Sequence, residues 1–269
     1  MSQIVRILKA FRTPRTAKAY LRDKYYKYYI ILNNFIRTPR SDGDFAPSDL
    51  PALDEIRQRA RSRTDVSDHL VTMFVEAVSA RPSLIVELGV RGGESNFVFE
   101  RVAGLYDSKI VSVDVTDCSD VVTGPHATFV KSDDVAFARG FKDWCRERGI
   151  QPDIDLLFMD TSHVHEHTVE EIDSWFPFLS PRAKVFLHDT NLREVYRRQN
   201  GTMGRGWDND RGVMRALERF FDKRFDETRD FVDFKNGWLI KHYHRCNGLT
   251  ILERVLSSSQ GQHAESARH

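Results

Sequence analysis

Two aspartates in the second half of the sequence each end a short apolar run. Asp160 closes the run DLLFMD, and Asp189 closes the run KVFLHD. The runs predict two neighbouring parallel strands, whose carboxyl ends would lie roughly 4.8 Å apart at one edge of a sheet. Carboxylates at both ends could share a hard divalent cation such as Mg²⁺. That cation would orient vicinal hydroxyls of an acceptor and lower the pKa of the one that reacts.

Histidines lie beside both aspartates. His163 follows Asp160 by three residues and could accept a proton as a general base. His188 directly precedes Asp189 and could ligate the metal, although a buried structural histidine is the alternative. Asp160 could also cap the helix that follows, and the histidines of the segment HVHEH lack the spacing of a zinc site. We predict catalytic roles for Asp160 and His163, and metal binding by Asp160, Asp189 and His188.

A glycine-containing turn, ELGVRGGES at 87–95, follows the first predicted strand. Glycines in such a turn let the backbone approach a ligand and begin the next helix. The turn lacks the glycine spacing of a dinucleotide fingerprint and has no Walker lysine, and its leading carboxylate would repel a phosphate. A ligand with a cationic group therefore fits better. The residues predicted to bind it are Glu87, Gly89, Arg91, Gly92, Gly93 and Ser95.

Two further acids follow the next two predicted strands. Asp114 ends the run IVSVD, where a carboxylate can accept both ribose hydroxyls of a nucleoside. After the third strand, Asp133 could accept a hydrogen bond from an adenine amine, and Asp134 could do so or be a helix N-cap. Plain strand-end capping by Glu87 and Asp114 is the alternative. A nucleoside with a positively charged tail, such as S-adenosylmethionine, fits all three sites.

Residues 191–211 form a long stretch without a clear secondary-structure pattern. A structureless stretch of this length in a compact domain is usually a functional lid, although a disordered excursion is the alternative. Aromatic faces stack on sugar rings, and arginines bind carboxylates or phosphates. The residues predicted to contact an acceptor are Tyr196, Arg205 and Trp207.

A sheet is needed to bring these residues together. Apolar runs separated by amphipathic helices are typical of a parallel sheet covered on both faces. Residues 230–242, with Asn-Gly at their centre, predict an antiparallel hairpin closed by a type I′ turn. We expect an α/β, Rossmann-like fold with a doubly wound, mostly parallel, seven-stranded sheet ending in this hairpin. The parallel strands are expected at 84–88, 110–114, 127–131, 155–160 and 184–189.

Residues 84–242 resemble the class I S-adenosylmethionine-dependent methyltransferases. ELGVRGG corresponds to their first motif and IVSVD to their ribose motif, and the final hairpin is also typical of them. The resemblance implies that Gly89 and its loop hold the methionine part of the cofactor, Asp114 the ribose and Asp133 the adenine edge. The segments DTSH and LHDTN resemble a narrower group, the macrocin O-methyltransferase and cephalosporin-hydroxylase-like branch, which often acts on sugars.

In that branch, an Asp after the fourth strand and a Glu-Asp pair on the fifth bind the metal, and a histidine three residues after the first Asp is the proposed base. Asp160, Asp189 and His163 match, whereas His188 stands where the branch has Glu. His188 or Asn191 could be the third ligand, a softer metal could be preferred, or the site could be metal-free.

The resemblance implies an O-methyltransferase that uses S-adenosylmethionine and Mg²⁺ or another divalent cation to methylate a hydroxyl of a sugar or glycan. A non-sugar small molecule as acceptor, or a non-catalytic scaffold with the same fold, is the alternative. Nucleic acid is not expected as a partner, because no base-amine methylation motif is present.

Composition limits the class of protein and the cellular compartment that can be expected. The chain has 269 residues, of which 41% are hydrophobic and 29% charged, as in an ordinary globular protein. It has no apolar run long enough to span a membrane, no secretory signal at its start and only three cysteines, without zinc-site spacing. We expect a cytoplasmic protein.

Basic residues are concentrated at residues 1–40, which carry a net charge of +9 in a chain whose total is +1. This arm predicts one or two amphipathic helices packed on the body or on a second subunit, as in a homo-oligomer. Peripheral contact with an anionic membrane, at its inner face, is an alternative, and nucleic acid is another. We expect a linker at 41–52, the methyltransferase domain at 53–256 and a disordered tail at 257–269.

Overall fold

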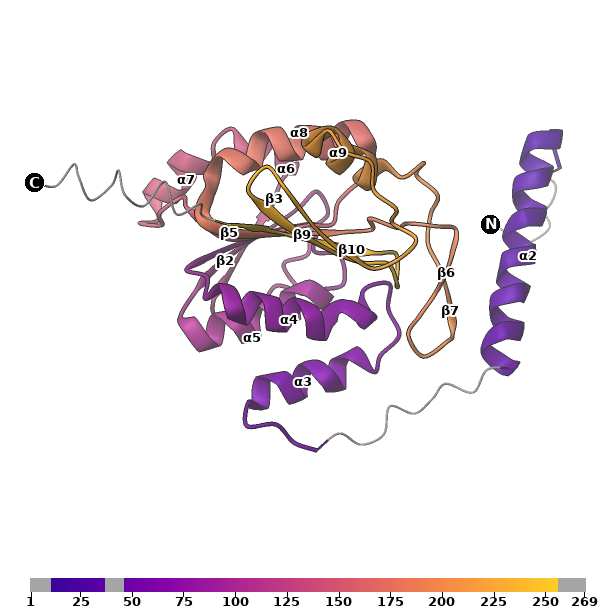
Figure 1. Cartoon of the computed structure of the whole chain (residues 1–269), viewed down its shortest axis with the longest axis horizontal. Helices are drawn as coiled ribbons and strands as arrows, with labels where there is room; N and C mark the ends of the chain where they lie inside the picture. The colour runs from indigo at the N-terminus through magenta and orange to yellow at the C-terminus, as the bar shows by residue number, and fades with distance from the viewer. Residues whose placement is uncertain (1–10, 37–45, 256–269) are drawn as a thin grey trace, which may run out of the picture.

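The computed structural model describes residues 11–36 and 46–255. Predictions for residues 1–10, for the linker before residue 46 and for the tail at 257–269 lie outside the described residues. Within them, one large sheet lies between two layers of helices, and a separate long helix stands at one side (Figure 1).

Eight strands form the sheet, in the order β3-β2-β1-β4-β5-β10-β9-β8. The first five pair in parallel as predicted, and β10 pairs antiparallel with both β5 and β9. The strand order reverses between β1 and β4, where the carboxyl ends of an open α/β sheet bind ligands. The strands are β1 Leu84–Leu88, β2 Lys109–Asp114, β3 Ala127–Lys131, β4 Ile154–Met159, β5 Leu179–His188, β8 Phe231–Lys235, β9 Trp238–Tyr243 and β10 Leu249–Arg254.

Helices cover both faces of the sheet, which explains why all five residues of β1 are buried although the strand does not alternate between apolar and polar residues. One layer consists of α3 Pro51–Ala60, α4 Leu70–Ala80 and α5 Glu94–Tyr106 (Figure 1). The other consists of α6 Asp134–Ala138, α7 Phe141–Glu147, α8 His165–Trp175 and α9 Gly212–Phe221. The doubly wound, Rossmann-like architecture is confirmed.

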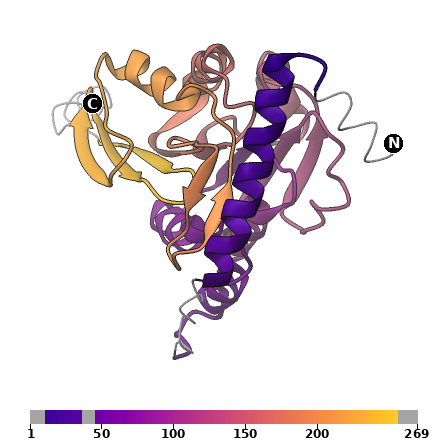
Figure 2. The ribbon, with the colours of Figure 1, turned by 90° about the vertical axis from the view of Figure 1, so that its right-hand side faces the viewer.

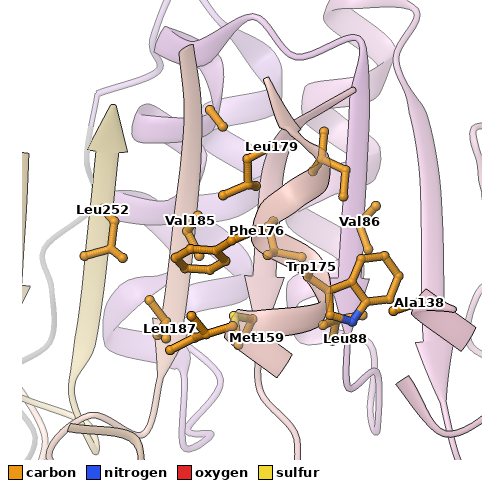
Figure 3. Close-up of a cluster of buried hydrophobic side chains, with 14 of the residues drawn as sticks. Val86, Leu88, Ala138, Met159, Trp175, Phe176, Leu179, Val185, Leu187 and Leu252 are labelled. Carbon is orange, nitrogen blue, oxygen red and sulfur yellow. The ribbon is translucent and has the colours of Figure 1, made fainter. Parts of the chain in front are cut away.

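Trp175 lies at the centre of the second layer's core. Its side chain is fully buried, and its ring centroid lies 5.0 Å from that of Phe141 in an edge-to-face arrangement. Val86 and Leu187 belong to the same cluster and come from the central strands (Figure 3). This packing fixes α8, and therefore the turn that connects β4 to α8, against the sheet.

The sheet has one strand more than the seven predicted. The extra strand arises because β10 lies between β5 and the predicted hairpin, so that the hairpin of β8 and β9 reaches the sheet only through β10. The hairpin turn itself is confirmed, since Asn236 and Gly237 have φ angles of 52° and 79°. Helix α3 begins at Pro51, inside the predicted linker.

Helix α2, Pro14–Ile36, lies outside both layers, alongside strand β7 (Met203–Arg205), which pairs with β6 (Val195–Arg197) (Figure 2). None of its residues is buried. The expectation that the arm packs its apolar stripe on the body is therefore wrong for this helix. Among the described residues, every helix is too short or too polar to cross a membrane.

Replacing Trp175 by alanine should lower the free energy of unfolding by about 3–5 kcal/mol, because a fully buried aromatic side chain would leave a cavity. Urea unfolding measures this loss. The control Val232→Ala, at a position 72% exposed on β8, should change the free energy by no more than about 0.5 kcal/mol. Equal stability of the two variants would contradict the assignment of Trp175 to the core.

Candidate active site

The ends of β4 and β5 bring Asp160, His163 and Asp189 together. The Nε2 atom of His163 lies 3.0 Å from Oδ2 of Asp189, and its Nδ1 atom lies 3.9 Å from Oδ1 of Asp160. Ligand atoms of the three side chains lie within 4.8 Å of one another, as in a site that could hold a metal ion. The predicted convergence of both aspartates and His163 at one sheet edge agrees with this geometry.

Two of these residues have an uncommon backbone conformation. His163 and Asp189 have φ angles of 59° and 56°, in the left-handed region that non-glycine residues rarely adopt. This conformation turns the Asp189 carboxylate toward His163. Oδ1 of Asp189 is buried and makes no hydrogen bond among the described residues, although Nδ1 of His188 lies 3.4 Å from it. A buried carboxylate oxygen without a hydrogen bond fits a cation ligand.

His188 lies behind this group and is almost fully buried. Its Nε2 atom is 3.3 Å from the carbonyl oxygen of Cys246, and its Nδ1 atom is 3.4 Å from an oxygen of Asp160 and from one of Asp189. Although burial alone would lower it, the pKa of His188 is raised well above its usual value by the carboxylates of Asp189 and Asp160.

Metal binding by His188 stays a prediction. Both ring nitrogens face oxygen atoms of the protein, and Nδ1 lies 3.4 Å from an oxygen of Asp160 and from one of Asp189. In its protonated form, which has no lone pair for a metal, His188 supplies positive charge beside the two carboxylates. The pKa of Asp189 is lowered: burial acts to raise it, but the charge and hydrogen bond of His188 and the charge of His163 together outweigh burial.

Gly89 brings the cofactor loop against the end of β4. It has a φ of 85°, and a Cβ atom at this position would lie 2.0 Å from the backbone oxygen of Asp160. The Asp160 N–H also donates to the carbonyl of Leu88 at 2.9 Å. Only glycine allows this approach, which places the predicted cofactor loop directly beside the acidic cluster.

Asp114 and the cofactor loop form one hydrogen-bonded unit. Oδ2 of Asp114 accepts the backbone N–H groups of Val90 at 2.9 Å and Arg91 at 3.1 Å, and Oδ1 accepts that of Thr116 at 2.7 Å. Each carboxylate oxygen has two lone-pair directions, so Asp114 can also accept a ribose hydroxyl. The ribose role stays a prediction, and the structure adds a second role in shaping the loop.

Glu87 supports the cofactor loop from the protein interior. It is fully buried, and its carboxylate accepts hydrogen bonds from Ser95 Oγ at 2.6 Å, Asn96 Nδ2 at 2.9 Å and Ser112 Oγ at 2.6 Å. Burial raises the pKa of Glu87. The predicted direct contact of Glu87 and Ser95 with the cofactor is wrong, because both side chains are enclosed and paired with each other.

The remaining residues of the cofactor loop differ in how accessible they are to a ligand. The side chain of Arg91 turns away from the loop and pairs with Asp65. Gly93 is the N-cap of α5 with a φ of 76°, whereas a Cβ on Gly92 would meet no atom within 4 Å. The backbone at Gly92 is thus open to a ligand, and its predicted role in binding the cofactor stays a prediction.

The side chains of Asp133 and Asp134 differ in burial and in hydrogen-bond partners. Asp133 is the N-cap of α6, where its Oδ1 accepts the N–H of Ala136 at 2.8 Å. Its side chain is exposed, so its other oxygen remains able to accept an adenine amine. Asp134, for which an N-cap was the alternative, is instead buried and pairs with His167 at 3.1 Å.

A second polar cluster was not predicted. Asp134, His167 and Glu171 group their ligand atoms within 4.8 Å, and Thr161 donates to Glu171 at 2.7 Å. Burial, followed by the effect of Asp134, holds the pKa of Glu171 well above its usual value. Because Thr161 lies between Asp160 and His163, the cluster positions the catalytic turn. The i, i+4 spacing of His167 and Glu171 was the available sequence signal.

Comparisons with known proteins agree with this arrangement. A family model described as "Methyltransferase domain" matches residues 86–190. The structure of MycE, a methyltransferase from the mycinamycin biosynthetic pathway, was solved with Mg, SAH and mycinamycin VI. It superposes with a TM-score of 0.50 at 18% identity, covering 77% of this chain and 56% of that one. An O-methyltransferase from Bacillus cereus in complex with SAH gives a TM-score of 0.50 at 12% identity, covering 84% and 99%.

Residues 86–190 therefore match a methyltransferase domain. They include the loop and both strand ends, and the five parallel strands with antiparallel strands at one edge agree with the fold of the solved methyltransferases. An uncharacterized protein of Sinorhizobium fredii, y4gI, is 31% identical over 131 residues. That match covers 42% of this chain and 14% of the longer protein.

On the acceptor side, one prediction is corrected. Tyr196 lies in β6 rather than in a structureless lid. Its side chain is buried against Gly204 and its hydroxyl accepts a hydrogen bond from Arg198. Arg205, in β7, pairs with Asp23 of α2 and lines a cavity together with Trp207, which is 69% exposed. Contact of Arg205 and Trp207 with an acceptor stays a prediction.

A cavity of 400 Å³ follows the end of β5, directly beyond Asp189. It is lined by Thr190 and Asn191, by the segment up to Val195, and by Tyr26 of α2. A neighbouring cavity of 350 Å³ includes Trp207 and again Tyr26. The first cavity thus follows the carboxyl end of β5, and the second lies between α2 and residues 205–208.

Gly89→Ala should destabilise the protein by roughly 1–3 kcal/mol, the cost of a left-handed backbone at a non-glycine residue, with a further loss from overlap with Asp160. Thermal unfolding without ligand measures this change. The control Gly92→Ala lies in the same loop, without a positive φ and with free space around its Cβ, and should keep wild-type stability. The reverse order of stabilities would contradict the described loop.

Proposed function

We propose that the protein transfers the methyl group of S-adenosylmethionine to a hydroxyl of a sugar or glycan. The observation that carries the proposal is the contact between Gly89 of the cofactor loop and the backbone of Asp160, which belongs to the acid–histidine cluster. A methyl donor held by the loop would therefore lie next to groups that can activate a hydroxyl. The family-model match to a methyltransferase domain supports the choice of donor.

S-adenosylmethionine suits the charges around the loop. Asp114 and the exposed Asp133 stand at the ends of β2 and β3, where ribose and adenine would bind. The negative charges of the Asp160 and Asp189 carboxylates would attract the positively charged sulfonium group. A phosphate-bearing nucleotide would meet the same carboxylates with a repulsive charge.

His163 is the proposed general base. Its Nε2 atom, at 3.0 Å, donates to Asp189 in the tautomer that we infer, which fixes the ring. Its Nδ1 atom is 3.9 Å from Asp160, too far for a hydrogen bond, and is therefore free to accept a proton. The acceptor oxygen attacks the methyl carbon, the carbon–sulfur bond breaks, S-adenosylhomocysteine leaves, and the hydroxyl proton moves to His163.

Asp160 and Oδ1 of Asp189 would hold a divalent cation. Such a cation supplies Lewis acidity that lowers the pKa of the acceptor hydroxyl. His188 stands where the related branch has a third carboxylate. An imidazole ligand there would give mixed oxygen and nitrogen donors, which favour a metal such as Mn²⁺ over Mg²⁺.

A sugar fits the acceptor side best. Neighbouring hydroxyls of a sugar can bind one cation together, which positions one of them against the methyl donor at roughly 3 Å. The exposed ring of Trp207 offers a face on which a sugar can stack. In the MycE structure, Mg and mycinamycin VI are bound together with SAH.

His163→Gln should lower kcat roughly 10²–10⁴-fold, since the base would be lost. A methyl-transfer assay with labelled S-adenosylmethionine and a panel of glycosides measures the rate. Isothermal titration should show unchanged binding of S-adenosylhomocysteine. The control His165→Gln removes a histidine two positions away and should retain activity. Wild-type protein that fails to bind S-adenosylhomocysteine would refute the proposed function as a whole.

Removal of divalent ions by a chelator should reduce turnover on the order of 100-fold or more, because the hydroxyl would no longer be acidified. Mn²⁺ should restore activity at a lower concentration than Mg²⁺. Binding of S-adenosylhomocysteine should not change, since the loop residues do not contact the metal. Full turnover in the presence of chelator would show that the reaction proceeds without metal.

A further inference from the structure

Helix α2 carries its apolar side chains on the side that faces away from the protein. Five large side chains recur at steps of four and three residues, which places them on one helix face. Each is between 56% and 86% exposed. We call this surface the outer face of α2; it consists of Leu21, Tyr25, Tyr28, Leu32 and Phe35.

The opposite, polar face of α2 makes the contacts with the body. Asn34 accepts the N–H of Met203 at 2.8 Å, Arg22 pairs with Glu194 at 2.9 Å, and Asp23 pairs with Arg205. At about 100° per residue, Asp23 and Asn34 lie about 140–160° from the centre of the outer face, and Arg22 lies about 100° from it. An ordinary surface helix turns its apolar stripe to the core, so α2 has the reverse orientation.

The charges beside the outer face have one sign. Lys18 and Lys24 lie on its two sides, about 60° from its centre at 100° per residue. Asp23 is the single acidic residue of α2, and its carboxylate is turned to the body, where Arg205 neutralises it. The solvent side of the helix therefore combines aromatic and aliphatic side chains with lysines, the pattern of a helix that lies in a membrane interface.

We propose that the outer face of α2 binds the surface of a membrane that contains anionic lipids. The apolar side chains would enter the boundary between headgroups and acyl chains while the lysines pair with lipid phosphates. The helix would lie flat, since no described helix can cross a membrane. A second copy of the chain fits less well, because two outer faces packed together would bring their lysines into proximity.

The orientation of α2 also relates the membrane to the catalytic domain. Tyr26, on the body side of the helix, lines both cavities beyond the end of β5. A membrane beneath the outer face would therefore be separated from these cavities by the thickness of one helix, about 10 Å. This arrangement favours acceptors that are themselves held at the membrane surface.

Vesicle sedimentation of the full chain tests the proposal. Wild-type protein should bind vesicles of phosphatidylcholine mixed with phosphatidylglycerol and should bind pure phosphatidylcholine weakly. The variant Leu21→Ser/Leu32→Ser/Phe35→Ser should lose at least about tenfold in binding, because three apolar side chains no longer enter the lipid. Lys18→Gln/Lys24→Gln should weaken binding to the anionic vesicles about tenfold, and added salt should reduce the difference.

A matched control removes exposed apolar side chains elsewhere. Val232→Ser/Phe234→Ser changes two exposed residues of edge strand β8 and should bind anionic vesicles like the wild type. Binding of S-adenosylhomocysteine verifies that each variant is folded. The proposal is overturned if wild-type protein does not pellet, or if the α2 variants pellet equally. It is also overturned if sedimentation velocity shows a dimer that the Leu21, Leu32 and Phe35 changes dissociate while vesicles are not bound.

Discussion

Two carboxylates held close together at adjacent strand ends are the constraint on which the site depends. Met159 and Leu187 pair in register, so Asp160 is level with His188, and Asp189 follows one residue later at the same edge of the sheet. Asp189 is almost fully buried, where like charges repel strongly unless positive charge lies nearby. His188 supplies that charge from within the protein. In the proposed reaction, a bound cation and His163 would act on the solvent side of the same pair.

The cofactor loop contacts the same edge of the sheet directly. Gly89 contacts the backbone at Asp160, and Asp114 holds the loop by accepting two of its N–H groups. Glu87 anchors the loop to α5 and β2 through three buried hydrogen bonds. Donor site and acid cluster therefore form one continuous unit, so a change in either displaces the other.

The parallel strands and the acids at their ends could be predicted because both depend on short local patterns. The roles of individual side chains could not, since they depend on partners far along the chain. The sequence around Glu87 does not distinguish a side chain that faces a ligand from one that, as here, faces Ser112. Tyr196 is buried only because β6 pairs with β7. His188 lies between two carboxylates and a carbonyl of a segment 58 residues away.

The left-handed backbone at His163 and Asp189 costs stability because neither residue is glycine. Glycine adopts this conformation without strain, whereas each of these side chains adds on the order of 1 kcal/mol or more. A chain selected only for robustness would therefore carry glycine at both positions. Under the proposed function, the protein would retain less than its attainable stability in order to keep His163 beside Asp189.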